Sequence, residues 1–180
     1  MASAASPRGP WTRVEDHPIL RPSDDPEQFD SMRVDDSCLV VREGGYWMYY
    51  KGRQHNRTPS ETRMGLAIAD SPAGPYRKCD GNPVLDSGHE VCVWPHASGV
   101  GCLVASVGPQ GNTLQYSDDG LHFHKIADTD PPKAPGPCRD DDFTEGRAPG
   151  VSWGVSMVHH RQWPYLVRFD CRLQGDALYR

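Results

Sequence analysis

The sequence predicts an all-β fold organised as part of a β-propeller, with two to three blades of four-stranded antiparallel sheet. Two observations support this prediction. Short runs of aromatic and β-branched residues alternate with polar turns, and 18 glycines and 17 prolines among 180 residues interrupt any long helix. The order of strands and turns also recurs along the chain, which is typical of propeller blades. The alternative is an ordinary β-sandwich whose halves resemble each other by accident.

The first repeat consists of a hairpin and two further strands. Its hairpin joins residues 37–42 (SCLVVR) to 46–51 (YWMYYK), both rich in strand-forming residues, through a glycine turn. A third strand is predicted at 64–69 (MGLAIA). A short outer strand begins at 76–78, after a turn rich in proline and glycine. These four segments have the composition of one blade.

The second repeat follows the same order. The segment His17-Pro-Ile-Leu20 leads into the first repeat and returns as Asn82-Pro-Val-Leu85. The strands expected in the second repeat cover 91–94, 102–107, 113–116 and 121–125. A partial third repeat is predicted from a hairpin of 151–158 and 165–169, after a long connection over 128–150. A propeller ring needs at least four blades, so the chain is expected to be truncated or to close its ring with a partner.

Composition excludes several classes of protein. The 19 Lys and Arg residues against 24 Asp and Glu residues give a net charge of −5, which argues against nucleic-acid binding. No apolar run approaches the roughly 20 residues of a membrane span, so no membrane partner is expected. Residues 1–10 are predicted to be a disordered N-terminus, with the partial propeller over 11–180. They lack the apolar stretch of a signal peptide, which predicts a cytoplasmic protein, although a truncated start could hide a leader.

Polar residues stand at matching places in the first two repeats. Asp35 and Asp36 precede the innermost strand of the first repeat, and His89 and Glu90 precede that of the second. Innermost strands line the channel of a propeller, so these side chains are expected to converge at one end of it. Carboxylates from different strands around one sugar suit glycosidic cleavage, because one group protonates the leaving oxygen and another activates water. A solvated turn is the alternative for each pair taken alone.

Other residues are candidates for contacting a sugar. Trp94 and Trp153 could stack on pyranose rings, although packing between blades explains each of them equally well. Arg139 is expected before the last innermost strand, where it could hold a hydroxyl group, orient a carboxylate or pair with its acidic neighbours. His96 is a further substrate-binding candidate. The histidines around Cys92 lack the spacing of a tetrahedral zinc site, and neither a metal nor a cofactor is predicted.

Several segments together carry a specific resemblance. They are FDSMRVDD, LVVREGGYWMYYKGR, GLAIADSPAGPYRK, NPVL, SGHEVCVWPH, YSDDGLHF, VSWGV and RFD. The chain from Trp11 to Asp170 resembles glycoside hydrolase family 117 and, more distantly, the arabinanases and xylosidases of family 43. The His-Glu pair after Asn-Pro-Val-Leu is the most specific element. The resemblance implies a five-bladed β-propeller with three acidic residues around its axis, present here in part.

The resemblance also implies roles for individual residues. Family 117 includes inverting neoagaro-oligosaccharide hydrolases, which release 3,6-anhydro-L-galactose. Asp36 matches an acidic residue of that pocket, with Asp35 as the fallback, while Glu90 matches another and His89 matches the proposed general acid. The general base of the family belongs to an earlier blade, and no inner-strand pattern precedes Asp36 here. The base and the N-terminal part of the fold are therefore expected to be missing.

The chain is accordingly predicted to be a glycoside hydrolase of oligosaccharides, in the chemistry of polysaccharide degradation. Anhydrogalactose-, arabinose- or galactose-type bonds are the expected targets. The alternative is a non-catalytic carbohydrate-binding or remnant propeller, which the missing base favours for the isolated chain. Open blade edges could also hold a second copy and give a homo-oligomer.

Overall fold

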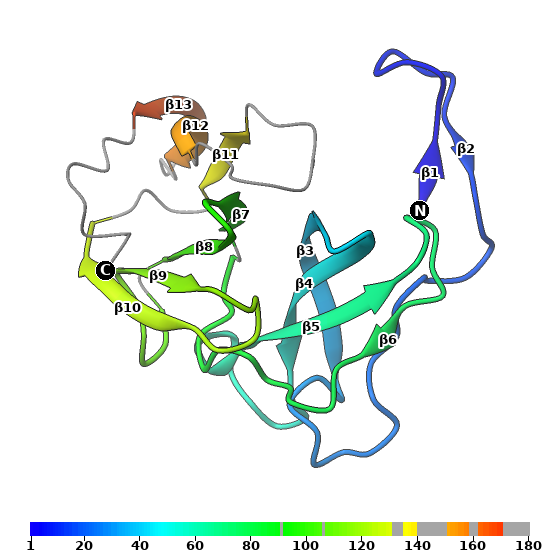
Figure 1. Ribbon diagram of the computed structural model, residues 1–180, viewed down its shortest axis with the longest axis horizontal. Helices are drawn as coiled ribbons and strands as arrows, with labels where there is room; N and C mark the ends of the chain where they lie inside the picture. Colours follow the sequence, from blue (N-terminus) through cyan, green and yellow to red (C-terminus); the bar gives the residue numbers. More distant parts are fainter. Residues whose placement is uncertain (91, 106, 131–134, 140–150, 159–161, 171–180) are drawn as a thin grey trace.

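The computed structural model covers residues 1–180 and describes all of them except 91, 106, 131–134, 140–150, 159–161 and 171–180 (Figure 1). The described residues form β-strands, and the one helical element among them is a turn of 3-10 helix, Pro59–Glu61. The all-β prediction is confirmed. No helix in the described part of the chain is long and apolar enough to cross a membrane.

The first sheet contains four antiparallel strands in the order β3-β4-β5-β6. Their bounds are Arg33–Arg42 (β3), Gly45–Arg53 (β4), Arg63–Ala69 (β5) and Arg77–Lys78 (β6). Arg42 pairs with Gly45 across a two-residue turn, in which Glu43 and Gly44 have φ angles of 52° and 74°. Positive φ at both central residues matches the twist of paired strands, so this turn fixes the register of the hairpin.

The second sheet repeats this order, with the strands β7-β8-β9-β10. Their bounds are Cys92–His96 (β7), Gly99–Val104 (β8), Thr113–Ser117 (β9) and His124–Asp128 (β10). The outer strand begins later than the predicted residue 121. The reason is that Asp119 Oδ1 accepts hydrogen bonds from the backbone N–H groups of Leu121 and His122, which keeps this segment in the turn.

The third sheet contains a strand that the sequence did not predict. Its order is β11-β12-β13, with bounds Gly136–Arg139, Val151–Val158 and Tyr165–Asp170. The sequence predicts the segment GPCR of β11 to be part of the connection over 128–150, because glycine and proline usually interrupt strands. Arg139 therefore lies in the innermost strand of this sheet instead of preceding it, and 151–158 is the second strand.

Short strands near the N-terminus form a small separate sheet. Ala2–Ser3 (β1) pairs with Thr12–Arg13 (β2) in antiparallel fashion. The disorder expected for residues 1–10 and the domain boundary at residue 11 stay predictions.

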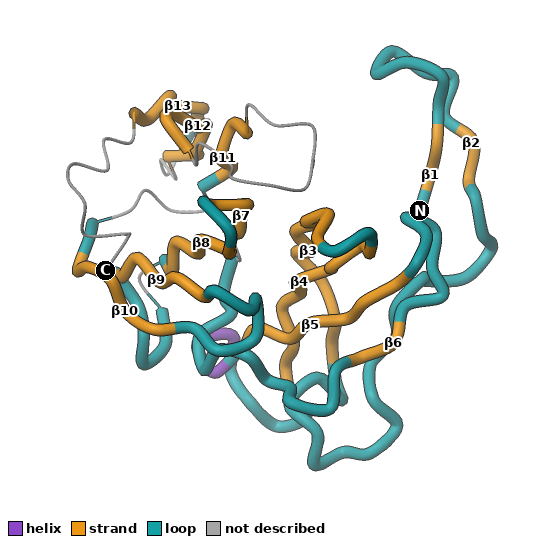
Figure 2. The backbone as a smooth tube through the Cα atoms, in the orientation of Figure 1, coloured by secondary structure: helices purple, strands orange, loops and turns teal. Residues whose placement is uncertain are grey.

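The three larger sheets are arranged as successive propeller blades. The strands β3, β7 and β11 each begin their sheet, and β7 contacts both β3 and β11 (Figure 2). Arg42, at the end of β3, donates a hydrogen bond to the carbonyl of Ser98, just beyond β7, and Cys38 Sγ donates to Val93 O at 3.3 Å. The strands β3 and β7 therefore run in the same direction, and their starts lie at the same end of the sheets.

Two hydrophobic clusters join neighbouring sheets. The cluster between the first and second sheets contains Val40, Trp47, Tyr49, Met64, Leu66, Leu85, Val93, Val100, Cys102 and Val104. The cluster between the second and third sheets contains Cys92, Trp94, Leu103, Leu114 and Val151. Successive residues of β7 point to opposite faces, so Val93 packs toward the first sheet while Cys92 and Trp94 pack toward the third.

Candidate active site

Asp35 and Asp36 lie at a β-bulge near the start of β3. Cys38 pairs with Tyr49 and Asp35 pairs with Lys51, so two residues of β3 face one residue of β4 between these pairs. Asp36 has a φ of 45° at this bulge, a left-handed conformation that aspartate adopts more readily than most residues. The prediction that both aspartates precede the strand was wrong, because the bulge lets strand pairing continue to Arg33.

Lys51 holds the two aspartates together. Its Nζ lies 3.3 Å from Asp35 Oδ1 and also pairs with Asp36 Oδ2, while Arg33 pairs with the second oxygen of Asp35. The side chain of Asp36 is 46% exposed and that of Asp35 is 20% exposed, so Asp36 is the carboxylate more open to a ligand. Sequence reasoning missed Lys51. The signal that identifies Lys51 in the sequence is its position opposite the aspartates in the predicted hairpin.

His89 and Glu90 form a turn directly before β7, as the sequence predicted. Both are partly buried. Glu90 has a φ of 59°, a conformation that costs about 1–2 kcal/mol for a residue with a Cβ atom. His89 Nδ1 is buried and has no hydrogen-bond partner among the described residues. Strain and unsatisfied polar atoms of this kind concentrate at functional sites, which singles out this turn.

Asp36 and Glu90 occupy equivalent places in neighbouring strands. Each lies two residues before a cysteine of an innermost strand, Cys38 in β3 and Cys92 in β7, and each has a left-handed backbone. Because β3 and β7 are adjacent and run in the same direction, both residues lie at the same end of the sheets. Two carboxylates and an imidazole placed at one end of adjacent blades can supply acid–base chemistry.

His96 and Trp94 lie farther along β7, away from this end. Each is 4% exposed. Trp94 packs over Gly101, where an added Cβ would lie 2.6 Å from the indole ring. The His96 ring meets Tyr116 edge-on with centroids 6.1 Å apart, and burial lowers the pKa of its imidazole. These are the contacts of packed interior residues, and the proposed role of both in substrate binding stays a prediction.

Trp153 and Arg139 belong to the third sheet. Trp153 is partly buried on β12, and the guanidinium of Arg168 lies over its ring at 4.5 Å from the centroid. One face of this ring is therefore occupied by a cation. Arg139 ends β11 and pairs with Val151, while its side chain lies outside the described part of the structure. Their contact with a sugar stays a prediction.

A third aspartate of the same segment, Asp30, is buried in the first sheet. Its Oδ2 accepts a hydrogen bond from Tyr50 Oη at 2.9 Å and pairs with Lys78 Nζ at 2.5 Å. Asn82 Nδ2 also donates to Tyr50 Oη at 3.3 Å. Because these groups satisfy the Asp30 carboxylate, Asp30 ties β4 and β6 to the segment before β3.

The cysteines and acidic residues give no sign of a metal centre. Within the ranges that the structure describes, no three His, Cys, Asp or Glu side chains gather closely enough to hold an ion. The five cysteines described there are free thiols, and Cys92 and Cys102 are buried. These thiols pack as small apolar groups.

Comparisons with solved structures identify similar folds. The chain is similar to Zg3597, a family 117 glycoside hydrolase produced by the marine bacterium Zobellia galactanivorans, with 32% identity and a TM-score of 0.83. This match covers 94% of the chain and 50% of Zg3597. The chain therefore spans about half the length of that relative, and its resemblance to family 117 is confirmed.

Two other solved structures are less similar. A family 32 β-fructofuranosidase from Bombyx mori, solved with sucrose, matches 77% of the chain and 34% of its own at 14% identity and a TM-score of 0.52. This match shows the fold alone and agrees with a partial β-propeller. A thermostable family 43 glycoside hydrolase matches 71% of the chain and 47% of its own at 23% identity, but its TM-score of 0.43 supports no argument. No family model and no curated protein matches the sequence.

Proposed function

We propose that the chain carries part of the active site of a glycoside hydrolase, which cleaves oligosaccharides with inversion through His89, Glu90 and Asp36. The observation that carries this proposal is the matched placement of Asp36 and Glu90, with left-handed backbones at the starts of adjacent strands. The family 117 hydrolase to which the chain is 32% identical supports the same class of reaction.

The proposed roles follow from the chemistry of the side chains. The imidazole of His89 would protonate the leaving oxygen, because its partly buried position lets it face a bound sugar. The Glu90 carboxylate beside it would orient this imidazole. Asp36, held by Lys51, would accept hydrogen bonds from sugar hydroxyl groups. The base that activates water would come from a further blade of the ring.

The decisive experiment replaces Glu90 with Gln and measures sugar release. Neoagarobiose and arabino-oligosaccharides are the substrates, and the chain is assayed alone and together with the N-terminal half of a family 117 hydrolase. Turnover should fall by about 10²–10⁴-fold while sugar binding is kept, because the amide retains the shape of the side chain but loses the negative charge that orients the general acid His89. Glu27→Gln is the matched control, since Glu27 is exposed in a loop. Unchanged turnover in Glu90→Gln would remove this residue from the mechanism.

A non-catalytic carbohydrate-binding propeller is the second candidate. It is favoured by one observation, that the described residues form three blade-like sheets and the chain spans half of its relative. Sugar binding without release of product, in the chain alone and in the complemented protein, would decide for it.

A further inference from the structure

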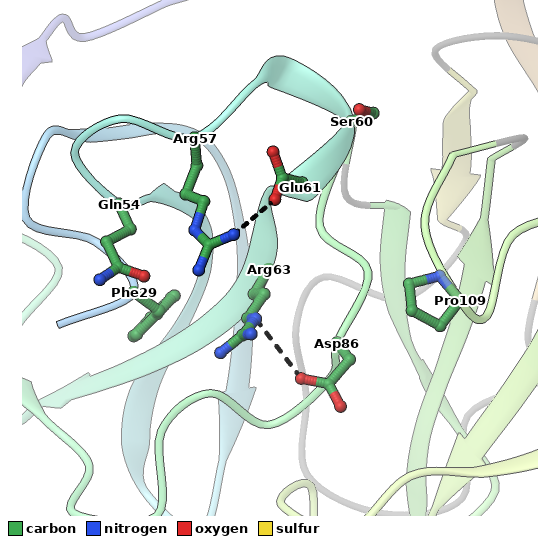
Figure 3. Close-up of a pocket in the computed structure, with 8 residues that line it drawn as sticks. All are labelled: Phe29, Gln54, Arg57, Ser60, Glu61, Arg63, Asp86 and Pro109. Atoms are coloured by element: carbon green, nitrogen blue, oxygen red, sulfur yellow. Dashed lines mark hydrogen bonds and ion pairs between the residues drawn. The ribbon is translucent and has the colours of Figure 1, made fainter. Parts of the chain in front are cut away.

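A pocket of about 270 Å³ opens beside the first sheet, outside the residues assigned to the candidate active site (Figure 3). Four of its residues come from the connection between β4 and β5, and the others come from Phe29, the start of β5, the segment before β7 and the β8–β9 loop. They are Phe29, Gln54, Arg57, Ser60, Glu61, Arg63, Asp86 and Pro109. The pocket thus lies at the junction of two blades.

This pocket lies at the same end of the sheets as Asp36 and Glu90. Arg33 pairs with Arg53, so the β4–β5 connection begins beside the start of β3. Only a few residues of chain separate the lining of the pocket from Lys51, which pairs with Asp36, and from His89. Gln54 follows Lys51 by three residues and Asp86 precedes His89 by three, and each step spans at most roughly 10 Å. A short oligosaccharide is long enough to span such a separation.

The walls of the pocket are held in place by hydrogen bonds. The buried Ser87 hydroxyl donates to Gln110 Oε1 and accepts from the Gln110 backbone N–H, both at 2.9 Å. Gly88 N–H donates to Thr62 O at 3.0 Å, and a Cβ on Gly88 would lie 2.2 Å from the backbone of Arg63. These contacts fix the segment before β7 against β5 and the β8–β9 loop. A preformed site of this kind loses little entropy when a ligand binds.

The pocket presents both donors and acceptors. Arg57 donates to Glu61 Oε1 at 2.9 Å, and Arg63 Nε lies 3.6 Å from Asp86 Oδ1. Hydrogen bonds from the backbone and hydroxyl of Thr58, together with Arg57, lower the pKa of Glu61 and keep it ionised. Each guanidinium has five N–H donors, so most of them remain for a ligand. In Figure 3 the Gln54 amide lies next to the Arg57 guanidinium, and the Arg63 guanidinium lies between these groups and Asp86.

We infer that this pocket binds a neutral sugar residue of the oligosaccharide, away from the bond that is cleaved. Two arginines against two carboxylates leave no net charge to attract an anion, whereas planar donors beside acceptors suit the hydroxyl groups of a sugar. The inference rests on the proposed function and adds to it a preference for chains longer than a disaccharide.

The test measures binding by isothermal titration calorimetry, so that it does not depend on turnover. The probes are the disaccharide, tetrasaccharide and hexasaccharide of the neoagaro- and arabino-oligosaccharide series, with the full chain. The wild type should bind the hexasaccharide of one series about tenfold more tightly than its disaccharide. The double variant Arg57→Gln/Arg63→Gln should lose this gain and bind the disaccharide unchanged. Arg77→Gln, an exposed arginine of β6, is the matched control.

The outcomes separate this inference from the proposed function. Glu90→Gln should keep the gain of affinity with length, whether or not the wild type releases sugar. Equal affinity for all lengths, no binding of either series, or a double variant that keeps the gain would overturn the inference. Circular dichroism of the double variant checks its fold, which should be retained because Arg57 and Arg63 are 54% and 47% exposed.

Discussion

The junction between the first and second sheets differs sharply from the outer side of the third sheet. At the junction, Arg42 donates to Ser98 O at 2.9 Å and to Asp118 O at 2.6 Å, and Tyr49 Oη donates to Gly120 O at 2.8 Å. On the third sheet, large apolar side chains are exposed instead. They are Leu166 at 74%, Tyr165 at 54% and Val155 at 39%, and Trp163 just before β13 is 77% exposed.

This difference shows where the chain buries its own apolar side chains and pairs its own polar groups. A buried junction with paired polar groups is complete, whereas exposed apolar side chains on a sheet usually mark a surface that packs against something else. The first two blades therefore form the stable unit that positions Asp36 and Glu90. The third blade instead exposes apolar side chains to solvent.

The largest expected effect comes from opening the junction. Met64 is fully buried in its hydrophobic cluster, and Met64→Ala should lower the free energy of unfolding by about 2–5 kcal/mol because it leaves a cavity. Urea denaturation measures this loss. Val155→Ala on the third sheet is the comparison and should change stability by less than about 1 kcal/mol. Equal losses for both variants would mean that the two regions do not differ.

A smaller effect is expected from removing the hydrogen bonds that Arg42 makes across the junction. Arg42→Met keeps the aliphatic stem but deletes both hydrogen bonds to carbonyl groups, and should destabilise the chain by about 2 kcal/mol. Arg168→Met is the control, because Arg168 is 61% exposed and its ion pair with Asp170 should contribute less than about 1 kcal/mol. If Arg168→Met lowered the free energy of unfolding as much as Arg42→Met, the Arg42 hydrogen bonds would have no special part in joining the blades.

The smallest effect on stability is expected at the third sheet, where self-association should change instead. Leu166→Lys places a charge on an exposed strand, so unfolding should shift by less than about 0.5 kcal/mol while association falls. Light scattering after gel filtration measures the mass of both proteins. Ala127→Lys, at an exposed position of β10, serves as the control. A wild type that is already monomeric would show that this surface does not drive association.

Local patterns predicted most of the strands, because they depend on neighbours in the sequence. The hairpin of β3 and β4 follows from two apolar runs and a glycine turn, and the two-residue turn then fixes its register. The strand β11 escaped prediction because its glycine and proline weaken the local signal. It exists because β12 supplies its hydrogen-bond partners. Pairing with a distant segment overrode the local preference there.

The candidate site was predictable in its residues but not in its geometry. The repeats pointed to Asp36, His89 and Glu90 at matching places. The bulge that moves the aspartates into β3, and the lysine that holds them, depend on how the strands pair. From sequence alone, Trp94 could be interpreted as a sugar platform or as an interior residue, and His96 as a substrate-binding residue. The structure adds that both side chains are buried, and the sequence could not show this because burial depends on which segments pack together.

The sequence by itself determined an all-β chain of repeated blades, its resemblance to family 117 and the residues that carry that resemblance. These properties lie in local composition, turn chemistry and motif, all of which can be read along the chain. The tertiary structure alone decided which strands are innermost, that β3 and β7 run side by side, and that a pocket of donors and acceptors lies next to their starts. These depend on contacts between residues far apart in the sequence, and such contacts form only when sheets pack.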